Sequence, residues 1–189
     1  MFKLKKLTDC KWINLFEVIY KHKSEQQRNW LMCSRKTNPI IDAAKADAVM
    51  IVPIVKTEHG NRLVVTKEFR VPIWDYEYSF PAGLIDDGED ITLTVARELK
   101  EETGLEVEKI HHISMPVYST AGMTDESNHM VIVEAKGIAT NNLCHSDEDI
   151  EVLLMDVDEI KLLLASNKKV SAKVWGILFH YARINKIEL

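Results

Sequence analysis

The sequence predicts an α/β protein in which helices cover both faces of a mixed β-sheet, a three-layer α/β/α sandwich. Runs rich in β-branched and aromatic residues recur along the chain, which is typical of strands. Segments with helical periodicity separate these runs once in the middle and twice near the end. One sheet enclosed between helices buries such a pattern. The 189 residues suffice for one sizeable core with an appendage.

The start of the chain predicts a small N-terminal β-extension, residues 1–45, ahead of a main domain, residues 46–189. Trp12–Tyr20 and Asn29–Arg35 are rich in strand-forming residues and are separated by a polar stretch, which indicates two strands joined by a turn. The basic stretch Lys3–Lys6 is expected to be a solvated end. Because a two-stranded sheet is marginally stable alone, the extension must pack on something else.

The main domain is expected to open with two strands, Ala46–Val55 and Arg62–Phe69, whose reversal lies at Gly60-Asn61. Tyr76–Ala82 then forms an extended approach to Gly83. This approach places backbone carbonyl groups beside the loop that begins at Gly83.

The later elements complete the sheet and add helices that cover it. In the last helix, Trp175, Leu178 and Phe179 are expected on the buried side. The segment Tyr118–Asn128 is polar and rich in turn-forming residues. We expect strands at Val107–Val117, His129–Ala135 and Ile150–Leu154, and helices at Val157–Ser166 and Ser171–Arg183.

A helix from Ile91 to Thr103 is expected in the middle of the chain. Asp90 suits the N-cap position, no proline interrupts the segment, and Gly104 falls where a helix ends in the left-handed conformation. The helical period places Val95 and Leu99 on one apolar face. The adjacent face carries three carboxylates, from Glu98, Glu101 and Glu102.

These three carboxylates are close enough to repel one another. Glu98 and Glu102 are four residues apart and so lie one above the other, with Glu101 beside them. Arg97 and Lys100 are expected to lie toward the side away from the line that joins Glu98 and Glu102. A hard divalent cation is therefore a better counter-charge, since carboxylate oxygens are the ligands that such ions prefer.

The spacing around the helix is that of a known signature. It consists of glycine, five residues, glutamate, seven residues, Arg-Glu, an apolar residue, any residue, Glu-Glu, any residue, glycine and an apolar residue. The segment from Gly83 to Leu105 matches it at seven identities and two apolar positions. By this spacing the chain resembles the Nudix hydrolases. The resemblance implies a Nudix-type α/β/α sandwich and an enzyme, a pyrophosphohydrolase that acts on phosphoanhydride bonds.

The resemblance also implies a metal cofactor, Mg²⁺ with Mn²⁺ as a substitute, and roles for the residues of the signature. Glu98 and Glu102 would be the principal ligands, and Glu101 would assist them or bind a second ion. Glu101 is also a catalytic candidate, and so is Arg97, which is expected to orient a glutamate, with Glu89 as its natural partner. The implied metal ligands are therefore Ala82, through its main-chain carbonyl, and Glu98, Glu101 and Glu102.

Outside the signature, the chain resembles the ADP-ribose pyrophosphatase group. Phe69-Arg70 resembles the group's arginine-bearing strand, and Pro81-Ala82-Gly83 matches its Pro-Ala-Gly. Thr120-Ala121-Gly122 stands where the group has Ser-Pro-Gly, and Ser79 stands where it has glutamate. Arg70 and Gly122 are accordingly the implied substrate-binding residues.

The acidic segment 146–152 resembles the late loop that supplies the catalytic base in this group. Glu148 is the implied residue that orients or deprotonates the attacking water. Asp147, Asp149 and Glu151 are close enough in sequence to be the correct choice instead.

The favoured function is a Mg²⁺-dependent hydrolase that splits a nucleoside diphosphate linked to another moiety, ADP-ribose or an ADP-sugar first. The products are a nucleoside monophosphate and a phosphorylated remainder. Two alternatives stay open: a nucleoside triphosphate pyrophosphohydrolase that cleans the nucleotide pool, and a non-catalytic nucleotide-sugar sensor. The resemblance further implies a homodimer formed by exchange of the N-terminal strands.

Composition argues against several other classes. The formal net charge of −5 disfavours a general nucleic-acid binder. Cys10, Cys33 and Cys144 are odd in number and widely spaced, which indicates neither a disulfide framework nor a zinc site. The apolar runs are far too short to span a membrane. We therefore expect a cytoplasmic protein with a small-molecule substrate, without nucleic-acid or membrane partners.

Overall fold

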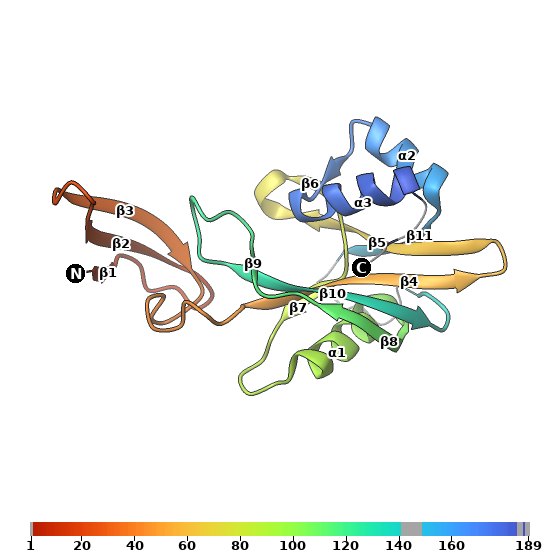
Figure 1. Ribbon diagram of the computed structural model, residues 1–189, viewed down its shortest axis with the longest axis horizontal. Coiled ribbons are helices and arrows are strands. Elements are labelled where there is room, and N and C mark those ends of the chain that lie inside the picture. The colour runs from red at the N-terminus through yellow and green to blue at the C-terminus, as the bar shows by residue number, and fades with distance from the viewer. Residues whose placement is uncertain (1, 141–148, 185–186, 188–189) are drawn as a thin grey trace. The chain divides into compact units, whose positions relative to one another are not determined.

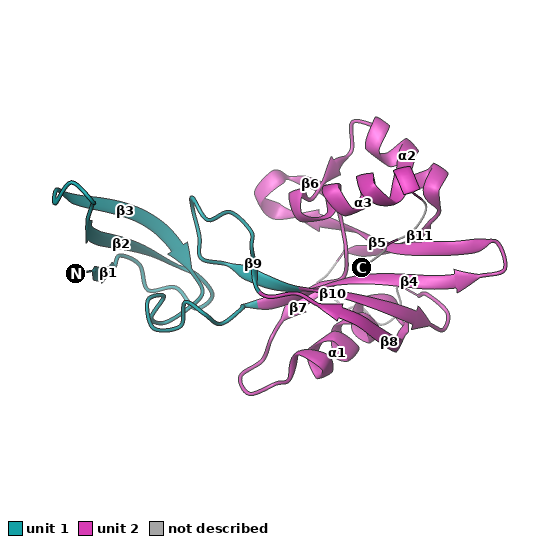
Figure 2. Cartoon of the chain, viewed as in Figure 1, with its two compact units in different colours: residues 1–47, 116–129 teal, residues 48–115, 130–189 magenta. Residues whose placement is uncertain are grey.

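The contacts of the chain divide it into two compact units, shown in different colours in Figure 2. The computed structural model describes residues 2–140, 149–184 and 187. Most of the first unit comes from the segment predicted as an N-terminal extension, and a second segment from later in the chain joins it. The first unit consists of residues 1–47 and 116–129, and the second of residues 48–115 and 130–189.

The first unit contains a three-stranded antiparallel sheet in the order β1-β2-β3 (Figure 1). Its strands are β1 (Lys3–Lys6), β2 (Asn14–Lys21) and β3 (Gln27–Ser34). Lys3–Lys6 is largely exposed, as expected of a solvated stretch, but it is also a strand that was not predicted, which pairs with β2 from Lys3 opposite Ile19 to Lys6 opposite Phe16. Backbone pairing does not depend on apolar side chains, and lysine is common on edge strands.

A buried charge cluster joins the end of β3 to the second segment of the first unit. Lys36 Nζ lies 3.5 Å from Asp47 Oδ2 and 3.4 Å from Asp125 Oδ2. The three side chains are only 8, 6 and 17% exposed. Ser34 Oγ donates to Asp125 at 3.1 Å, and the Ser127 amide donates to Asp47 at 3.0 Å. One ammonium group therefore lies near two largely buried carboxylates and offsets one of their two negative charges.

The second unit is built on a large mixed sheet with the strand order β12-β6-β5-β4-β10-β8. Strand β11 pairs with β5 and β7 with β4, whereas β9 and the residues of β10 that pair with it belong to the first unit. The β5–β6 and β10–β8 pairs are antiparallel, whereas β12 lies parallel to β6. The bounds are β4 Ala48–Thr57, β5 Gly60–Arg70, β6 Asp75–Ser79, β7 Ala82–Leu84, β8 Glu106–Ile113, β9 Val117–Tyr118, β10 Ser127–Lys136, β11 Ile150–Met155 and β12 Lys169–Val170.

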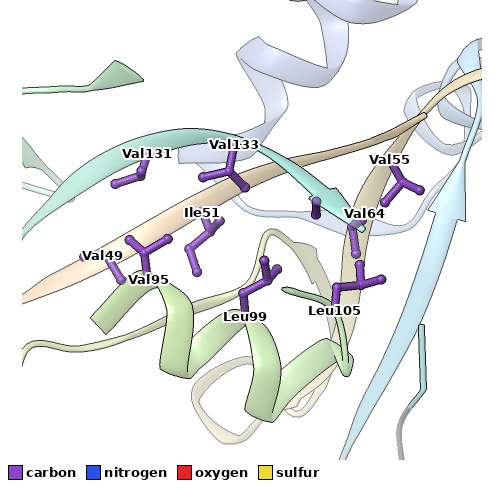
Figure 3. Close-up of a cluster of buried hydrophobic side chains, with 10 residues drawn as sticks. Val49, Ile51, Val55, Val64, Val95, Leu99, Leu105, Val131 and Val133 are labelled. Carbon is purple, nitrogen blue, oxygen red and sulfur yellow. The ribbon is translucent and has the colours of Figure 1, made fainter. Parts of the chain in front are cut away.

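Strand β4 separates two apolar layers. Val49 and Ile51 belong to the buried cluster that contains the side chains of helix α1 (Ile91–Thr103), as Figure 3 shows. Met50 and Val52 belong to the cluster formed with helices α2 (Val157–Ala165) and α3 (Ala172–Ile184). Since successive strand residues point to opposite faces, α1 covers one face of the sheet and the other two helices cover the opposite face (Figure 1). The predicted α/β/α sandwich is confirmed.

The reversal between β4 and β5 lies two residues earlier than expected. Thr57 pairs directly with Gly60, so the loop consists of Glu58 and His59. Gly60, with a φ of 103°, is the first residue of β5 and supplies the positive φ that closes the hairpin.

Helix α3 buries a different stripe from the one expected. Its buried residues are Val174, Leu178 and Tyr181, whereas Trp175 and Phe179 are 47 and 42% exposed. Their rings stack on each other instead, with centroids 5.1 Å apart. Four residues separate the two aromatics, so they form a stripe beside the buried one. In the described part of the chain, none of the helices has the length and apolar character needed to cross a membrane.

Candidate active site

Helix α1 begins and ends as the sequence predicts. The Asp90 carboxylate accepts a hydrogen bond from the Thr92 amide, which satisfies an amide of the first turn. Gly104, with a φ of 74°, ends the helix in the left-handed conformation, and its amide donates to the Lys100 carbonyl. Between these caps, Val95 and Leu99 are fully buried against the sheet. This packing fixes which face of α1 presents the carboxylates.

Strand β7 meets the carboxylates of α1 at Gly83. The Glu98 carboxylate lies so close to Gly83 that a methyl group on this glycine would overlap it. The glycine of the signature therefore serves close approach of a side chain to the backbone, since it has an ordinary negative φ.

Glu102 is held at the other end of the carboxylate row. Its residue is 9% exposed, and its Oε2 accepts a hydrogen bond from the Ala82 amide at 3.2 Å. Ala82 and Glu102, both predicted metal ligands, are thus brought together from β7 and α1. The observed contact uses the amide of Ala82, whereas the prediction concerns its carbonyl oxygen.

Arg97 lies at the centre of the carboxylates. Its Nε and Nη2 donate to the two oxygens of Glu89 at 3.1 and 2.9 Å, the partner expected from the sequence. Its Nη1 donates to Glu98 at 2.6 Å and to Glu101 at 3.3 Å. The expectation that Arg97 lies toward the side away from the line joining Glu98 and Glu102 is wrong for its guanidinium, because the long side chain reaches Glu98. Nη2 also donates to the Leu84 carbonyl at 3.1 Å.

Thr94 is a part of this network that sequence reasoning did not identify. Its buried hydroxyl donates to Glu89 Oε2 at 2.8 Å. Thr94 is four residues before Glu98, so the helical period places it on the carboxylate face, and this is the indication that the sequence offers. Hydrogen bonds from Arg97 first, and then from Thr94, lower the pKa of Glu89 to about 2. The same bonds to Glu89 raise the pKa of Arg97.

Replacing Arg97 with methionine is expected to raise the pKa of Glu89 from about 2 toward its ordinary value of 4.5. A carboxyl with a depressed pKa in the folded state contributes stability above its ordinary pKa, and this contribution is lost as the pH falls toward 2. The variant should therefore be less stable than the wild type above the ordinary pKa of 4.5, and the difference should shrink as the pH falls toward 2. Carboxyl NMR titration of Glu89 measures the shift. Arg62→Met, which removes an arginine paired with Asp156, is the control and should leave the Glu89 pKa unchanged.

The residues of α1 fit a hard divalent cation. Within the described residues, no three histidine, cysteine or acidic side chains already converge as in a metal site. The reason is that Arg97 engages Glu98 and Glu101, and the Ala82 amide engages Glu102. The donor set is nevertheless all oxygen, and the missing side chain of Gly83 leaves room for the Glu98 carboxylate beside the backbone of β7.

Gly83→Ala is expected to lower kcat about a hundredfold, because the new methyl group must displace the Glu98 carboxylate. The chain should still fold, since the affected side chain can rotate away. Gly176→Ala is the matched control, because its new methyl group meets no atom within 4 Å. Equal kcat values for Gly83→Ala and the wild type would show that the position of Glu98 does not matter.

Arg70 lies at the end of β5, on the face that carries α1. Its Nη2 is 2.7 Å from Glu68 Oε2, and its Nε is 4.0 Å from Glu77. Alternation along β5 places Arg70 and Glu68 on the same face as Val64, which packs in the α1 cluster. The predicted substrate residue Arg70 thus shares a face with the carboxylates. Gly122, the other predicted substrate residue, belongs to the first unit.

The predicted catalytic base, Glu148, lies outside the described residues, as does Asp147. Asp149 accepts a hydrogen bond from the Tyr76 hydroxyl at 2.5 Å, and Glu151 accepts one from Lys67 Nζ at 2.7 Å. Glu151 pairs with Lys67 in the sheet, on the face that carries α2 and α3. These two alternatives for the base are therefore engaged away from α1.

Comparisons with known proteins agree with this geometry. A model of the NUDIX domain matches residues 44–174. The chain is 33% identical over 177 residues to "Putative nudix hydrolase 2" of Caenorhabditis elegans, covering 91% of this chain and 78% of that protein. It is 38% identical over 133 residues to an "ADP-ribose pyrophosphatase" of Saccharomyces cerevisiae, covering 69% of this chain and 56% of that protein.

Two further similarities extend the comparison. An "ADP-sugar pyrophosphatase" of Mus musculus is 30% identical over 138 residues, covering 72% of this chain and 62% of that protein. The chain thus spans about three fifths of the yeast and mouse relatives. A crystal structure of an "ADP compounds hydrolase" has the same fold, with a TM-score of 0.73 at 21% identity over 95% of this chain and 90% of that one. The chain belongs to the Nudix family, hydrolases that act on pyrophosphate bonds and typically use a divalent metal.

Proposed function

We propose that this chain is a Mg²⁺-dependent hydrolase that cleaves the pyrophosphate bond of a nucleoside diphosphate linked to another moiety. ADP-ribose and ADP-sugars are the favoured substrates, and the products are a nucleoside monophosphate and a phosphorylated remainder. The observation that carries the proposal is the seating of the α1 carboxylates on β7, with Glu98 against Gly83 and Glu102 on the Ala82 amide. The yeast and mouse relatives, named for ADP-ribose and ADP-sugars, support the substrate class.

The chemistry explains the need for this seating. The phosphorus of a pyrophosphate is surrounded by negatively charged oxygens that repel an incoming nucleophile. Mg²⁺, or Mn²⁺ in its place, would neutralise that charge as a Lewis acid. Three carboxylates on one rigid helix are suited to hold it, with the Ala82 carbonyl as a further ligand. The metal ligands we propose are Ala82, Glu98, Glu101 and Glu102.

Arg97 is proposed to position the carboxylates. It holds Glu89 with two hydrogen bonds and reaches Glu98 and Glu101 with a third nitrogen. A guanidinium fixed in this way limits the rotamers of its partners, so that their oxygens are placed before the substrate arrives.

Arg70 and Gly122 are proposed to bind the substrate, and Glu148 to orient or deprotonate the attacking water. The guanidinium of Arg70 suits an anionic diphosphate, and its neighbours Glu68 and Glu77 suit hydroxyl groups of a sugar. The engagement of Asp149 and Glu151 by Tyr76 and Lys67 favours Glu148 over them.

A panel of substrates with product identification tests the proposal. The purified chain with Mg²⁺ is incubated with ADP-ribose, ADP-sugars, other nucleoside diphosphate conjugates and nucleoside triphosphates. AMP together with a phosphorylated remainder is the expected result. Pyrophosphate as the main product would instead favour a triphosphate pyrophosphohydrolase, and tight binding of ADP-ribose without turnover would favour a sensor.

We further propose that the chain forms a homodimer through its N-terminal sheet. In the described residues β2 is the only strand paired with β3, whose other edge is bridged at Cys33 by Thr124, and Trp30 and Leu31 on this strand are exposed. Light scattering after gel filtration measures the mass in solution. A monomer that retains full activity would refute the proposal.

A further inference from the structure

A cavity of about 230 Å³ lies in the second unit, between β5, β6 and the residues that precede β12. Tyr76 and Tyr78 of β6 contribute two aromatic rings to its lining. Lys67, Lys168 and Lys169 contribute three ammonium groups, against the single lining carboxylate of Asp75. A concentration of lysines is unexpected in a chain whose formal net charge is −5.

The cavity is separate from the carboxylate site on α1. Lys67 follows Val65 by two residues on β5, and Val65 packs in the cluster formed with α2 and α3. The β5–β6 register pairs Lys67 with Tyr78 and Phe69 with Tyr76, so both tyrosines share the face of Lys67. The α1 carboxylates lie on the opposite face of the sheet. A ligand in this cavity therefore cannot be the diphosphate bound at α1.

Two of the lysines are held in place by neighbouring groups. Lys67 Nζ donates to Glu151 at 2.7 Å and lies 4.7 Å from the centroid of the Tyr76 ring. Lys169 Nζ donates to the Ile73 carbonyl at 3.0 Å and lies 3.1 Å from an oxygen of Asp75. These contacts order the ammonium groups on the wall of the cavity before any ligand enters.

Three further donors line the cavity without a side-chain hydrogen bond to the described residues, and one of them, the Lys168 ammonium, also attracts the Asp75 carboxylate. Within residues 2–140 and 149–184, the Tyr78 hydroxyl, the Asn167 amide and the Lys168 ammonium make no side-chain hydrogen bond. A ligand that satisfies them must offer several acceptor oxygens and negative charge. Phosphate provides both, because it is negatively charged and its oxygens accept hydrogen bonds from the lysine ammonium group.

The size of the cavity limits what is attached to the phosphate. Its volume of about 230 Å³ is below the roughly 300–1,000 Å³ of sites for drug-sized ligands. A dinucleotide is therefore too large, whereas a sugar ring with one phosphate group is of suitable size. The apolar faces of the Tyr76 and Tyr78 rings can pack against the ring carbons of such a sugar.

We propose that this cavity is an accessory binding site for a small monophosphorylated sugar. The phosphate group lies near Lys168, and Tyr78 and Asn167 bind the sugar oxygens. Because Lys67 and Lys169 keep carboxylate partners, the net attraction is moderate, and dissociation constants of about 0.1–1 mM are expected.

The test measures binding directly, with ribose 5-phosphate and inorganic phosphate as probes. Calorimetry and NMR titration are performed without divalent metal on Glu102→Gln, which disables the α1 site. Saturable binding of ribose 5-phosphate that shifts the resonances of Tyr78 and Asn167 is expected. Absence of ribose 5-phosphate binding would overturn the proposal. Equal affinities for ribose 5-phosphate and inorganic phosphate would overturn it as well.

Matched lysine variants locate the site. Lys168→Ala should weaken binding about tenfold or more, whereas Lys161→Ala, an exposed lysine of α2 outside the cavity, should leave it unchanged. Equal losses in both variants would indicate unspecific attraction and contradict the proposal. Thermal melting confirms that both variants fold. The measurement does not depend on turnover, so its outcome is independent of the proposed hydrolase activity.

Discussion

Glu102→Gln is expected to lower kcat about a thousandfold while leaving the fold intact. Glu102 is the carboxylate fixed by the Ala82 amide on β7, and its residue is 9% exposed. Glutamine keeps the size of the side chain and an oxygen that accepts this hydrogen bond, but it removes the negative charge that would hold the metal. Kinetics are measured at several Mg²⁺ concentrations with a substrate identified from the panel. Turnover should be slower and should respond less to added Mg²⁺ than in the wild type.

Glu106→Gln provides the matched control for this loss. Glu106 begins β8 and pairs with Lys100 at the exposed end of α1, so its charge is close to the helix but outside the carboxylate row. Its kcat should stay near that of the wild type. Glu98→Gln should behave like Glu102→Gln, whereas Glu148→Gln should slow turnover while sparing substrate binding. A fully active Glu102→Gln enzyme would remove α1 from the mechanism.

Lys36→Met is expected to lower the free energy of unfolding by about 3–5 kcal/mol. The ammonium of Lys36 is the counter-charge of Asp47 and Asp125, and all three side chains are largely buried. Methionine fills similar space but leaves two largely buried carboxylates without their cation, which is costly. Urea denaturation followed by circular dichroism measures the change in stability.

Arg35→Met is the control for Lys36→Met. Arg35 is the preceding residue, and it pairs with Glu126 at 3.5 Å through a more exposed side chain. Exposed ion pairs of this kind contribute about 0–1 kcal/mol. If both variants lost equally little stability, the cluster around Lys36 would not hold the two segments of the first unit together.

Helix α1 could be predicted from the sequence because its determinants are local. Asp90 and Gly104 act on the backbone within one turn of the helix, and Val95 and Leu99 set its buried face by period alone. The spacing from Gly83 to Leu105 then identified the family. Information of this kind lies within a short stretch of chain.

The features that the sequence did not predict depend on contacts across the fold. Lys3–Lys6 forms a strand because β2 offers it partners, and no local pattern announces this. Trp175 and Phe179 are exposed because Val174, Leu178 and Tyr181 face the core. A helix wheel assigns angles but does not say which neighbouring stripe meets the sheet.

The arrangement of the site was predictable only in part for the same reason. The helical period placed the carboxylates together. It gives only the direction in which Arg97 leaves the helix, whereas the length of the side chain lets its guanidinium reach Glu98 and Glu101. The overlap of Glu98 with any side chain at Gly83 follows from the packing of α1 on β7. Only the folded chain brings these residues into contact.

The division of β4 between two layers has a consequence for how this protein can change over time. Val49 and Ile51 support α1, whereas Met50 and Val52 pack with Ile160 and other residues of the α2–α3 layer. The two layers share the backbone of the sheet but not its side chains. Substitutions in the α2–α3 core should therefore alter melting temperature far more than turnover. In directed evolution, stabilising substitutions in the α2–α3 core could therefore offset the stability that substitutions in the α1 layer remove.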